Sequence, residues 1–239
     1  MQHQLAPATT APSPRIARRS LVLASAASVA LPFGIVGAQT PSAPLVAPPI
    51  ASAFDGIHYL RGLVRVNGER ITSEKALIRP GDSLTTGSDG QIWLAIGADA
   101  IFLRQRTELV IQPSAARSSV IGALRLVTGA VGAVFGKRST EQVRILTATA
   151  TIGIRGTGTY METRGEGLYF CTCHGQVELT SVRTGASAIV AATQHAPRLC
   201  PNEPVDGQWI MDAPFETHTD DEMDGLEKCV GRRAPWVRR

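Results

Sequence analysis

Cysteine and histidine residues, both common metal ligands, are concentrated in the last third of the chain. All four cysteines and three of the five histidines lie after residue 170: Cys171, Cys173, Cys200, Cys229, His174, His195 and His218. Thiolate sulfur and imidazole nitrogen suit zinc and copper. Cys171 and Cys173 with His195 or His218 therefore predict a zinc or copper site, although the spacing is not that of a recognised zinc finger. The candidate ligands are Cys171, Cys173, His195 and His218.

The same cysteines have an alternative role as disulfide partners. On an extended strand Cys171 and Cys173 point to one face, whereas His174 points to the other. Their Cα atoms would then lie about 6.5–7 Å apart, so a bond between them would be strained. In an oxidising compartment Cys171 or Cys173 could instead pair with Cys200 or Cys229. Free buried thiols are the remaining interpretation.

A haem group or an enzyme active site has less support. Covalent haem attachment requires Cys-x-x-Cys-His, and the run at residues 171–174 is one residue too short. The sequence has no Gly-x-Ser-x-Gly nucleophile motif, no P-loop and no His-Glu-x-x-His motif. The Gly-Thr-Gly run at residues 156–158 is too short to hold a phosphate. We therefore expect a protein without enzymatic activity.

Composition and charge limit the class of protein further. The chain has 239 residues, of which 44% are hydrophobic and 18% charged, which excludes a disordered chain, a coiled coil and a multi-pass membrane protein. Three arginines without any acid in the first 38 residues, Arg15, Arg18 and Arg19, account for most of the net charge of +4. The remainder is nearly neutral, so no nucleic-acid partner is expected.

The first 38 residues have the layout of an export signal. Arg18 and Arg19 precede a weakly apolar stretch that ends at the small residues 36–38. Paired arginines in this position indicate twin-arginine export, with cleavage after Ala38 and the periplasm as the destination. The alternative is a retained membrane anchor over residues 21–38. No other segment is apolar enough, so no membrane span is expected once the signal has been cleaved.

The rest of the chain is predicted to be all-β. Residues 39–54 form a Pro-rich linker that disfavours a helix or a central strand. Residues 55–195 contain short β-branched runs separated by turns, such as the Asn67-Gly68 hairpin turn. Residues 196–239 form a C-terminal extension that contains cysteine and histidine. The expected fold is a stack of short antiparallel strands, as a β-sandwich or a β-solenoid-like domain.

One helix is predicted, over residues 220–230. Thr219 and Glu222 have the spacing of a capping box, in which each side chain bonds the backbone of the other. Gly231 is a suitable C-terminal stop. The apolar stripe consists of Met223, Leu226 and Val230. Because an isolated helix of this length is marginal in water, we expect this stripe to dock on the β-domain. The acids Asp220, Asp221 and Glu222 are expected to remain in solvent.

Residues 147–157 contain the spacing A-x-x-G-x-R-G-T, preceded by Gly-Ala-Val at residues 129–131 and followed by a further strand pattern at residues 175–179. With these motifs, residues 57–190 resemble the FecR domain, which is named for the ferric-citrate regulator. The resemblance implies an extracytoplasmic domain of stacked strands for protein recognition or sensing, with a protein partner in the cell envelope. Only a short signal-like segment precedes the match, so direct control of a sigma factor is not expected.

The FecR-like signature also has a physical interpretation. Gly153 and Gly156 allow tight backbone bends on either side of Arg155. The Arg155 guanidinium can join neighbouring carbonyls or a carboxylate. We therefore expect a structural role for Arg155, Gly153, Gly156 and Thr157.

Overall fold

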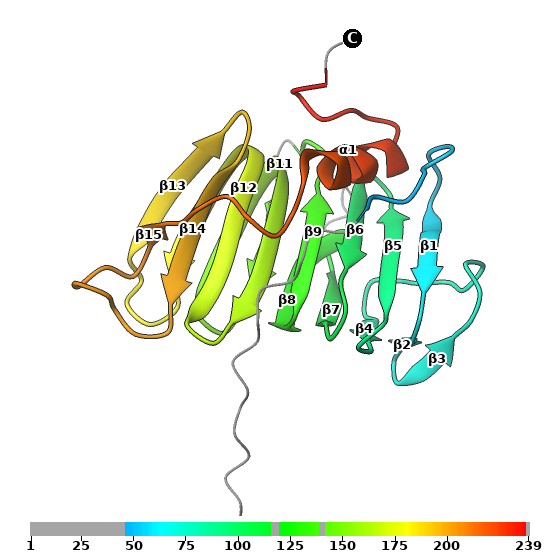
Figure 1. The fold of residues 1–239 in the computed structure, drawn as a ribbon, viewed down its shortest axis with the longest axis horizontal. Helices are drawn as coiled ribbons and strands as arrows, with labels where there is room; N and C mark the ends of the chain where they lie inside the picture. Colours follow the sequence, from blue (N-terminus) through cyan, green and yellow to red (C-terminus); the bar gives the residue numbers. More distant parts are fainter. Residues whose placement is uncertain (1–45, 116–119, 139–141, 238–239) are drawn as a thin grey trace, which may run out of the picture. The chain divides into compact units, whose positions relative to one another are not determined.

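The computed structural model describes residues 46–115, 120–138 and 142–237. These residues form one 15-stranded sheet and the helix α1 (Asp220–Cys229), as Figure 1 shows. The predicted all-β fold with a short C-terminal helix is therefore confirmed. The predicted signal at residues 1–38 and the linker up to residue 45 lie outside the described residues, whereas residues 46–54 form neither helix nor strand, as predicted. Within the described ranges no helix is long and apolar enough to span a membrane.

The strands differ widely in length. In chain order they are β1 (Gly56–Arg61), β2 (Val64–Val66), β3 (Glu69–Ile71), β4 (Ser83–Thr86), β5 (Gln91–Ile96), β6 (Asp99–Leu103), β7 (Glu108–Pro113), β8 (Ile121–Thr128), β9 (Ala130–Val134), β10 (Val143–Leu146), β11 (Ala150–Arg164), β12 (Gly167–Ser181), β13 (Ser187–Ala192), β14 (Ala196–Pro201) and β15 (Met211–Asp212). The prediction of short strands is wrong for β11 and β12, which have 15 residues each.

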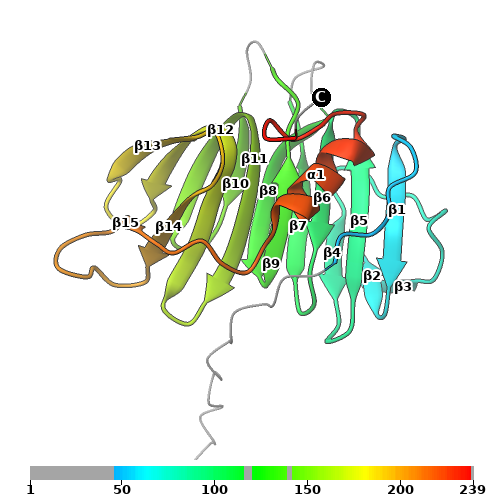
Figure 2. The same ribbon diagram turned by 45° about the horizontal axis from the view of Figure 1, so that its top comes forward.

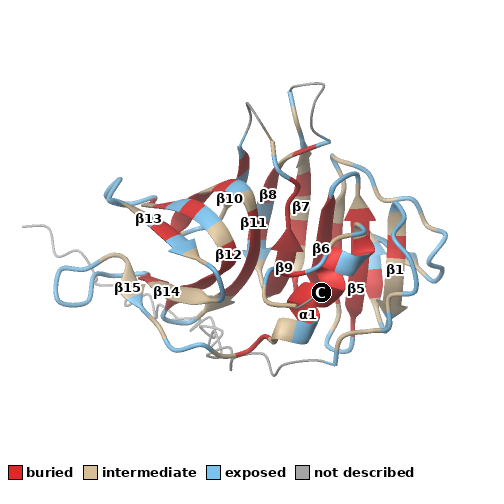
Figure 3. Ribbon diagram, turned by 90° about the horizontal axis from the view of Figure 1, so that it is seen from above, coloured by how far each residue is buried: buried red, intermediate tan, exposed pale blue. Residues whose placement is uncertain are grey.

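These two long strands connect two layers of the sheet. The first part of β11, Thr151–Ile154, pairs with β10, and its later part, Gly158–Glu162, pairs with β9. From β9 the sheet continues through β6 and β5 to β1, which we call the helix-side layer. From β10 it continues through β8, β7, β4 and β2 to β3, which we call the far layer. The sheet thus folds back on itself, as Figure 3 shows from above.

Strand direction departs from the prediction at one pair. All pairs in the described sheet are antiparallel except β8 and β10, which run parallel. The chain leaves β8 for β9 in the helix-side layer and returns to the far layer as β10, so the two strands point the same way. At the Asn67-Gly68 turn the predicted hairpin is confirmed, because both residues have positive φ (52° and 85°) and connect β2 to β3.

β12 extends both layers beyond β11. Its first part, Gly167–Thr172, pairs with β14, and its second part, Gly175–Thr180, pairs with β13. β15 then pairs with β14. Residues 196–212 of the predicted C-terminal extension therefore continue the same sheet as residues 55–195.

The space between the two layers holds the main core. Buried apolar side chains alternate inward along both layers, including Leu94 and Ile101 from the helix-side layer and Leu109 and Leu124 from the far layer. A second cluster lies on the outer face of the helix-side layer, and we call it the outer cluster. Its fully buried members are Trp93, Ala100, Phe102, Ala130, Val134, Tyr160, Tyr169, Cys171, Cys173, Met223, Leu226 and Cys229.

Helix α1 covers the outer cluster. It packs across β5, β6 and β9, as the turned view in Figure 2 shows. The predicted capping box is present: Glu222 N donates to Thr219 Oγ1 (3.2 Å), and Thr219 N donates to a Glu222 carboxylate oxygen (2.9 Å). Met223 and Leu226 are fully buried, so the predicted docking is confirmed. Gly231 follows the helix with φ 71°.

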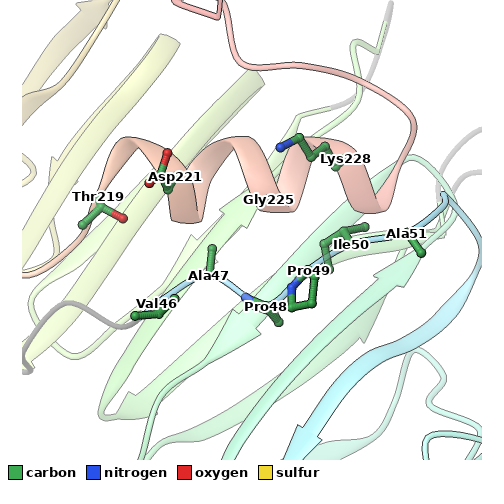
Figure 4. A pocket seen from close by; sticks show the side chains of 10 residues that line it. All are labelled: Val46, Ala47, Pro48, Pro49, Ile50, Ala51, Thr219, Asp221, Gly225 and Lys228. Atoms are coloured by element: carbon green, nitrogen blue, oxygen red, sulfur yellow. The ribbon is translucent and has the colours of Figure 1, made fainter.

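Close approach of α1 to the sheet depends on Gly225. A Cβ atom there would lie 3.0 Å from Trp93 Cζ3, tighter than an ordinary contact. Residues 46–51 lie beside the helix (Figure 4), and a Cβ atom on Gly225 would also lie 3.6 Å from Ala47 Cβ. Ala47 and Ile50 of that segment pack against the outer cluster. The described part of the predicted linker thus adds a second cover to the same face.

The expectation that all three acids of the first helical turn remain in solvent is wrong for Glu222. Asp221 is exposed and the Asp220 side chain is 44% exposed, but Glu222 is fully buried. Its carboxylate accepts two hydrogen bonds from Arg104 Nη2, at 2.8 and 3.0 Å. Arg104 follows β6 and is also fully buried, so an ion pair joins the helix start to the sheet.

Replacement of Leu226 by alanine should lower the free energy of unfolding by about 2–3 kcal/mol, since it removes a fully buried side chain between helix and sheet. Urea unfolding followed by circular dichroism measures this loss. The matched surface change in the same helix, Asp221→Asn, should cost less than about 1 kcal/mol. Equal losses for the two variants would show that the helix face contributes nothing to stability.

Candidate metal centre

Three separate segments bring the four predicted ligands together. Cys171 and Cys173 lie on β12, His195 lies between β13 and β14, and His218 comes directly before the N-cap of α1. The two sulfur atoms and one nitrogen of each imidazole all lie within 4.8 Å of one another. Both cysteines and His218 are buried, and His195 is half-buried. The structure thus assembles a Cys₂His₂ set from residues up to 47 positions apart in the sequence.

A β-bulge positions the two cysteines. The β11–β12 register pairs Gly158 with His174 and Thr159 with Thr172, which leaves Cys173 as the extra residue. A bulge redirects side chains and is frequent beside functional sites. Strict alternation therefore fails here, and the prediction that His174 points to the opposite face is wrong.

His174 nonetheless stays outside the ligand set. Its Nε2 lies 3.0 Å from Glu227 of α1, and its ring meets Trp236 edge-on at 5.9 Å. Gly158 is needed opposite it, because a Cβ there would lie 2.5 Å from the imidazole.

The orientation of His195 is set by its backbone and by Asp220. The residue has φ 52°, and its N–H donates to the Cys173 carbonyl (2.9 Å). Its Nε2 lies 2.7 Å from Asp220 Oδ1, and a carboxylate can only accept, so Nε2 carries the proton. In the neutral ring, the form that binds a metal, the lone pair is then on Nδ1, which lies 3.7 Å from the Cys171 sulfur.

His218 is held in the opposite tautomer. Its Nδ1 lies 3.0 Å from the Glu216 carbonyl oxygen, which can only accept a hydrogen bond, so Nδ1 carries the proton and Nε2 of the neutral ring keeps the lone pair. That Nε2 lies 3.4 Å from the Cys173 sulfur. The ring stacks on Tyr160, with centroids 4.4 Å apart and planes inclined by 8°. Both imidazoles therefore direct a lone pair into the cluster, and each bonds a fixed acceptor on its other side.

These separations fit one tetrahedral ion. Zinc bonds sulfur at about 2.3 Å and nitrogen at about 2.0–2.1 Å, which places neighbouring ligand atoms about 3.3–3.8 Å apart. Two of the four sulfur–nitrogen distances, 3.7 and 3.4 Å, lie in this range, and all four ligand atoms lie within 4.8 Å of one another, so a small inward shift completes the tetrahedron. A metal-bound histidine usually donates its second ring N–H to a carboxylate or a carbonyl, as both histidines do here. The residues thus fit zinc or copper in ligand type, spacing and tautomer.

The two cysteines of the cluster differ in how readily their thiols ionise. Burial disfavours the Cys171 thiolate, but hydrogen bonds with Cys173, His195 and His218 outweigh burial and lower the pKa of Cys171 to about 4. Burial, together with the neighbouring Cys171 thiolate, raises the pKa of Cys173 well above its usual value. Burial lowers the pKa of His195, but Cys171 and Asp220 outweigh it and the pKa is raised. Without a metal, the Cys171 thiolate is therefore stabilised by protons on the neighbouring side chains, and a bound cation would take the place of those protons.

Aromatic rings close the site from solvent. Phe215 lies 4.1 Å from the His195 ring and 4.8 Å from the His218 ring, and Trp236 lies 5.3 Å from His195. Only 7% of the His195 side chain is exposed. The half-exposed Asp220 is the polar group between this centre and water.

The other two cysteines, Cys200 and Cys229, are not part of the ligand set. All four thiols are free, so no predicted disulfide is formed in the structure. Cys200 packs in the core between the layers, whereas Cys171 and Cys173 belong to the outer cluster on the opposite face of the helix-side layer. The sheet itself therefore separates Cys200 from them. Cys229 ends α1, whereas His218 lies just before its start.

The FecR-like signature forms the corner between the two layers and does not join the cluster. Gly156 has φ 56°, and the register shifts between Arg155 and Gly158. A Cβ on Gly153 would lie 2.9 Å from the Gln142 side chain. Arg155 is exposed; with the Gln142 amide oxygen turned toward it, its Nε and Nη2 lie 2.6 and 3.1 Å from that oxygen. Thr157 is buried, and its carbonyl accepts from Phe135 N (2.9 Å).

Sequence reasoning missed Asp220 and Glu216 as supports of the two histidines. Glu216 acts through its backbone carbonyl, which no residue type indicates. The Asp220 carboxylate, two residues after His218, was a usable signal for an outer hydrogen-bond partner.

Asp220→Ala is expected to weaken zinc binding about 10–100-fold, because His195 loses the carboxylate that fixes its tautomer. Competition titration with a chromophoric chelator measures the affinity. Asp221→Ala removes the neighbouring first-turn carboxylate and should leave the affinity within a few-fold of the unaltered protein. Identical affinities for the two variants would contradict this role of Asp220.

Comparisons with known proteins add little to this geometry. No protein-family model and no curated protein matches the chain. Two crystal structures of a "putative anti-sigma factor" from Parabacteroides distasonis ATCC 8503 are similar to it at 9% identity, with TM-scores of 0.45 and 0.43. Each match covers 56% of this chain and 60% of that chain, so the chain spans less than two thirds of that protein. The FecR resemblance stays a prediction from the sequence.

Proposed function

We propose that this protein binds one zinc ion through Cys171, Cys173, His195 and His218, and that the metal supports a non-catalytic recognition or sensor domain. The observation that carries the proposal is the pair of imidazoles, each with one nitrogen bonded to a fixed acceptor and the other directed at a cysteine sulfur. A buried hydrogen-bond network would not by itself need two cysteine sulfurs beside the two imidazoles, whereas a zinc site does.

The closed ligand set favours a structural metal over a catalytic one. Structural zinc sites use four protein ligands, whereas catalytic sites keep one position for water or substrate. Four protein donors are available here, and Phe215 and Trp236 cover the histidines.

Charge favours zinc over copper. Two thiolates neutralise Zn²⁺, so the loaded centre carries no net charge at a buried position. Cu⁺ with the same ligands would leave one negative charge beside the Asp220 carboxylate, which lies 2.7 Å from His195. Burial of that net charge is unfavourable.

The cellular setting of the proposal rests on the sequence. The twin-arginine-like signal at residues 1–38 supports the periplasm, and the FecR-like pattern supports recognition of a protein partner in the cell envelope. A closed metal centre suits this setting, since it stabilises a small domain without an enzymatic site.

Elemental analysis of protein purified from the periplasmic fraction tests the proposal. We expect about one zinc per chain, none in Cys173→Ala, and an unchanged content in the matched variant Cys200→Ala, whose thiol lies on the other face of the sheet. A native protein without zinc that cannot be loaded with it would overturn the metal site. Absence from the periplasmic fraction would overturn the location.

A further inference from the structure

We propose that the metal centre is a latch for α1: zinc holds the helix on the outer face of the helix-side layer, and loss of zinc releases it. This inference rests on the proposed zinc site. In this inference the metal controls whether α1 stays docked on the sheet, in addition to stabilising the folded protein.

The start of α1 is tied to the centre at two adjacent points. His218 is a ligand and is followed directly by Thr219, the N-cap residue. Asp220, the first residue of the helix, accepts the hydrogen bond from the second ligand histidine, His195 (2.7 Å). A bound ion would thus connect the helix start to β12, which carries both cysteines.

The buried ion pair depends on the same geometry. Glu222 caps Thr219 and pairs with Arg104 through one carboxylate. Its burial is favourable only while the helix start stays in place, because separated buried charges need water. Movement of residues 218–220 would therefore expose both charges to solvent and favour release of the helix.

Few other apolar contacts hold α1. Its fully buried apolar side chains are Met223, Leu226 and Cys229. A helix of 10 residues does not persist alone in water. At its far end Glu227 contacts His174 (3.0 Å) and Arg232 (2.5 Å). At its near end the restraints are the proposed metal centre and the Arg104–Glu222 ion pair, which depends on the same placement of residues 218–220.

Release would uncover a defined surface. α1 packs on β5 and β6, which carry Trp93 and Phe102 of the outer cluster, and Gly225 brings the helix close to the indole. His218, directly before the N-cap, covers the ring of Tyr160. Exposure of these rings would turn a covered apolar face into an accessible one. The core between the two layers contains no side chain of α1, so the two-layered sheet would remain folded after release of the helix.

Hydrogen–deuterium exchange on the mature chain tests the latch, with saturating zinc and after removal of zinc by a chelator. We expect the backbone amides of residues 223–230 to exchange at least ten-fold faster without zinc, those of β7 and β8 in the far layer to stay unchanged, and zinc re-addition to restore protection. Cys173→Ala should resemble the zinc-free protein, and Cys200→Ala should show the same response to zinc as the unaltered chain.

The alternative outcomes separate the latch from the site. Zinc binding with no change in helix exchange would overturn the latch and leave the proposed function intact. Faster exchange in both layers at once would also overturn it, since the metal would then stabilise the whole domain. Failure to bind zinc at all would overturn the proposed function and the latch together.

Discussion

Replacement of Arg104 by methionine is expected to lower the free energy of unfolding by about 3–5 kcal/mol, one of the two largest effects predicted for this protein. Arg104 and Glu222 are both fully buried, and their charged groups lie 2.8 Å apart. The substitution keeps an apolar side chain of similar length beside Phe102 and Tyr160, which the guanidinium now faces at 5.6 and 5.2 Å. It leaves the Glu222 charge buried without its arginine.

The double variant Arg104→Met/Glu222→Gln is the control for this interpretation. Glutamine retains the capping-box bond to Thr219 and removes the buried charge, so most of the lost stability should return. Urea unfolding of the unaltered protein and of both variants gives the comparison. A double variant as unstable as Arg104→Met would show that packing around Arg104, and not the uncompensated carboxylate, is responsible.

Zinc should stabilise the folded protein by about 4 kcal/mol when its free concentration is a thousand times the dissociation constant, because only the folded chain brings the four ligands together. Cys171→Ser/Cys173→Ser should lose this dependence completely, since both sulfur ligands are gone. The free energy of unfolding, measured at a series of buffered zinc concentrations, shows how strongly stability depends on zinc.

Cys200→Ala is again the matched variant. It removes a buried sulfur from the core between the layers and lowers the baseline stability, but its dependence on zinc should equal that of the unaltered chain. A zinc dependence that survives in Cys171→Ser/Cys173→Ser would place the ion elsewhere in the protein.

Local patterns predicted what local interactions determine. The Asn67-Gly68 turn follows from two residues that tolerate positive φ. The capping box at Thr219 and Glu222 lies within four consecutive residues, so its spacing alone predicts the start of the helix. The candidate ligand set was also visible in the sequence, because Cys171, Cys173, His195 and His218 are of the residue types that zinc requires.

Choices among chemically equivalent residues depended on the tertiary structure. His174 is adjacent to Cys173 in the chain, yet the bulge turns it toward Glu227, whereas the distant His218 reaches the sulfur at 3.4 Å. Cys200 carries the same thiol group as Cys171 and Cys173, but it packs on the other face of the sheet. Sequence spacing contains no measure of which face a residue occupies once a bulge or a second layer intervenes.

The ion pair between Arg104 and Glu222 was the least visible feature from sequence alone. The two residues are 118 positions apart, and an acid in the first turn of a helix is normally explained by the helix dipole. Only the docking of α1 on β6 places both charges in one dry site, where neither is stable without the other. Residue type and local spacing thus determined the turn, the cap and the candidate ligands, whereas the packing of layers and helix decided which side chains meet, because contact across a sheet depends on the path of the whole chain.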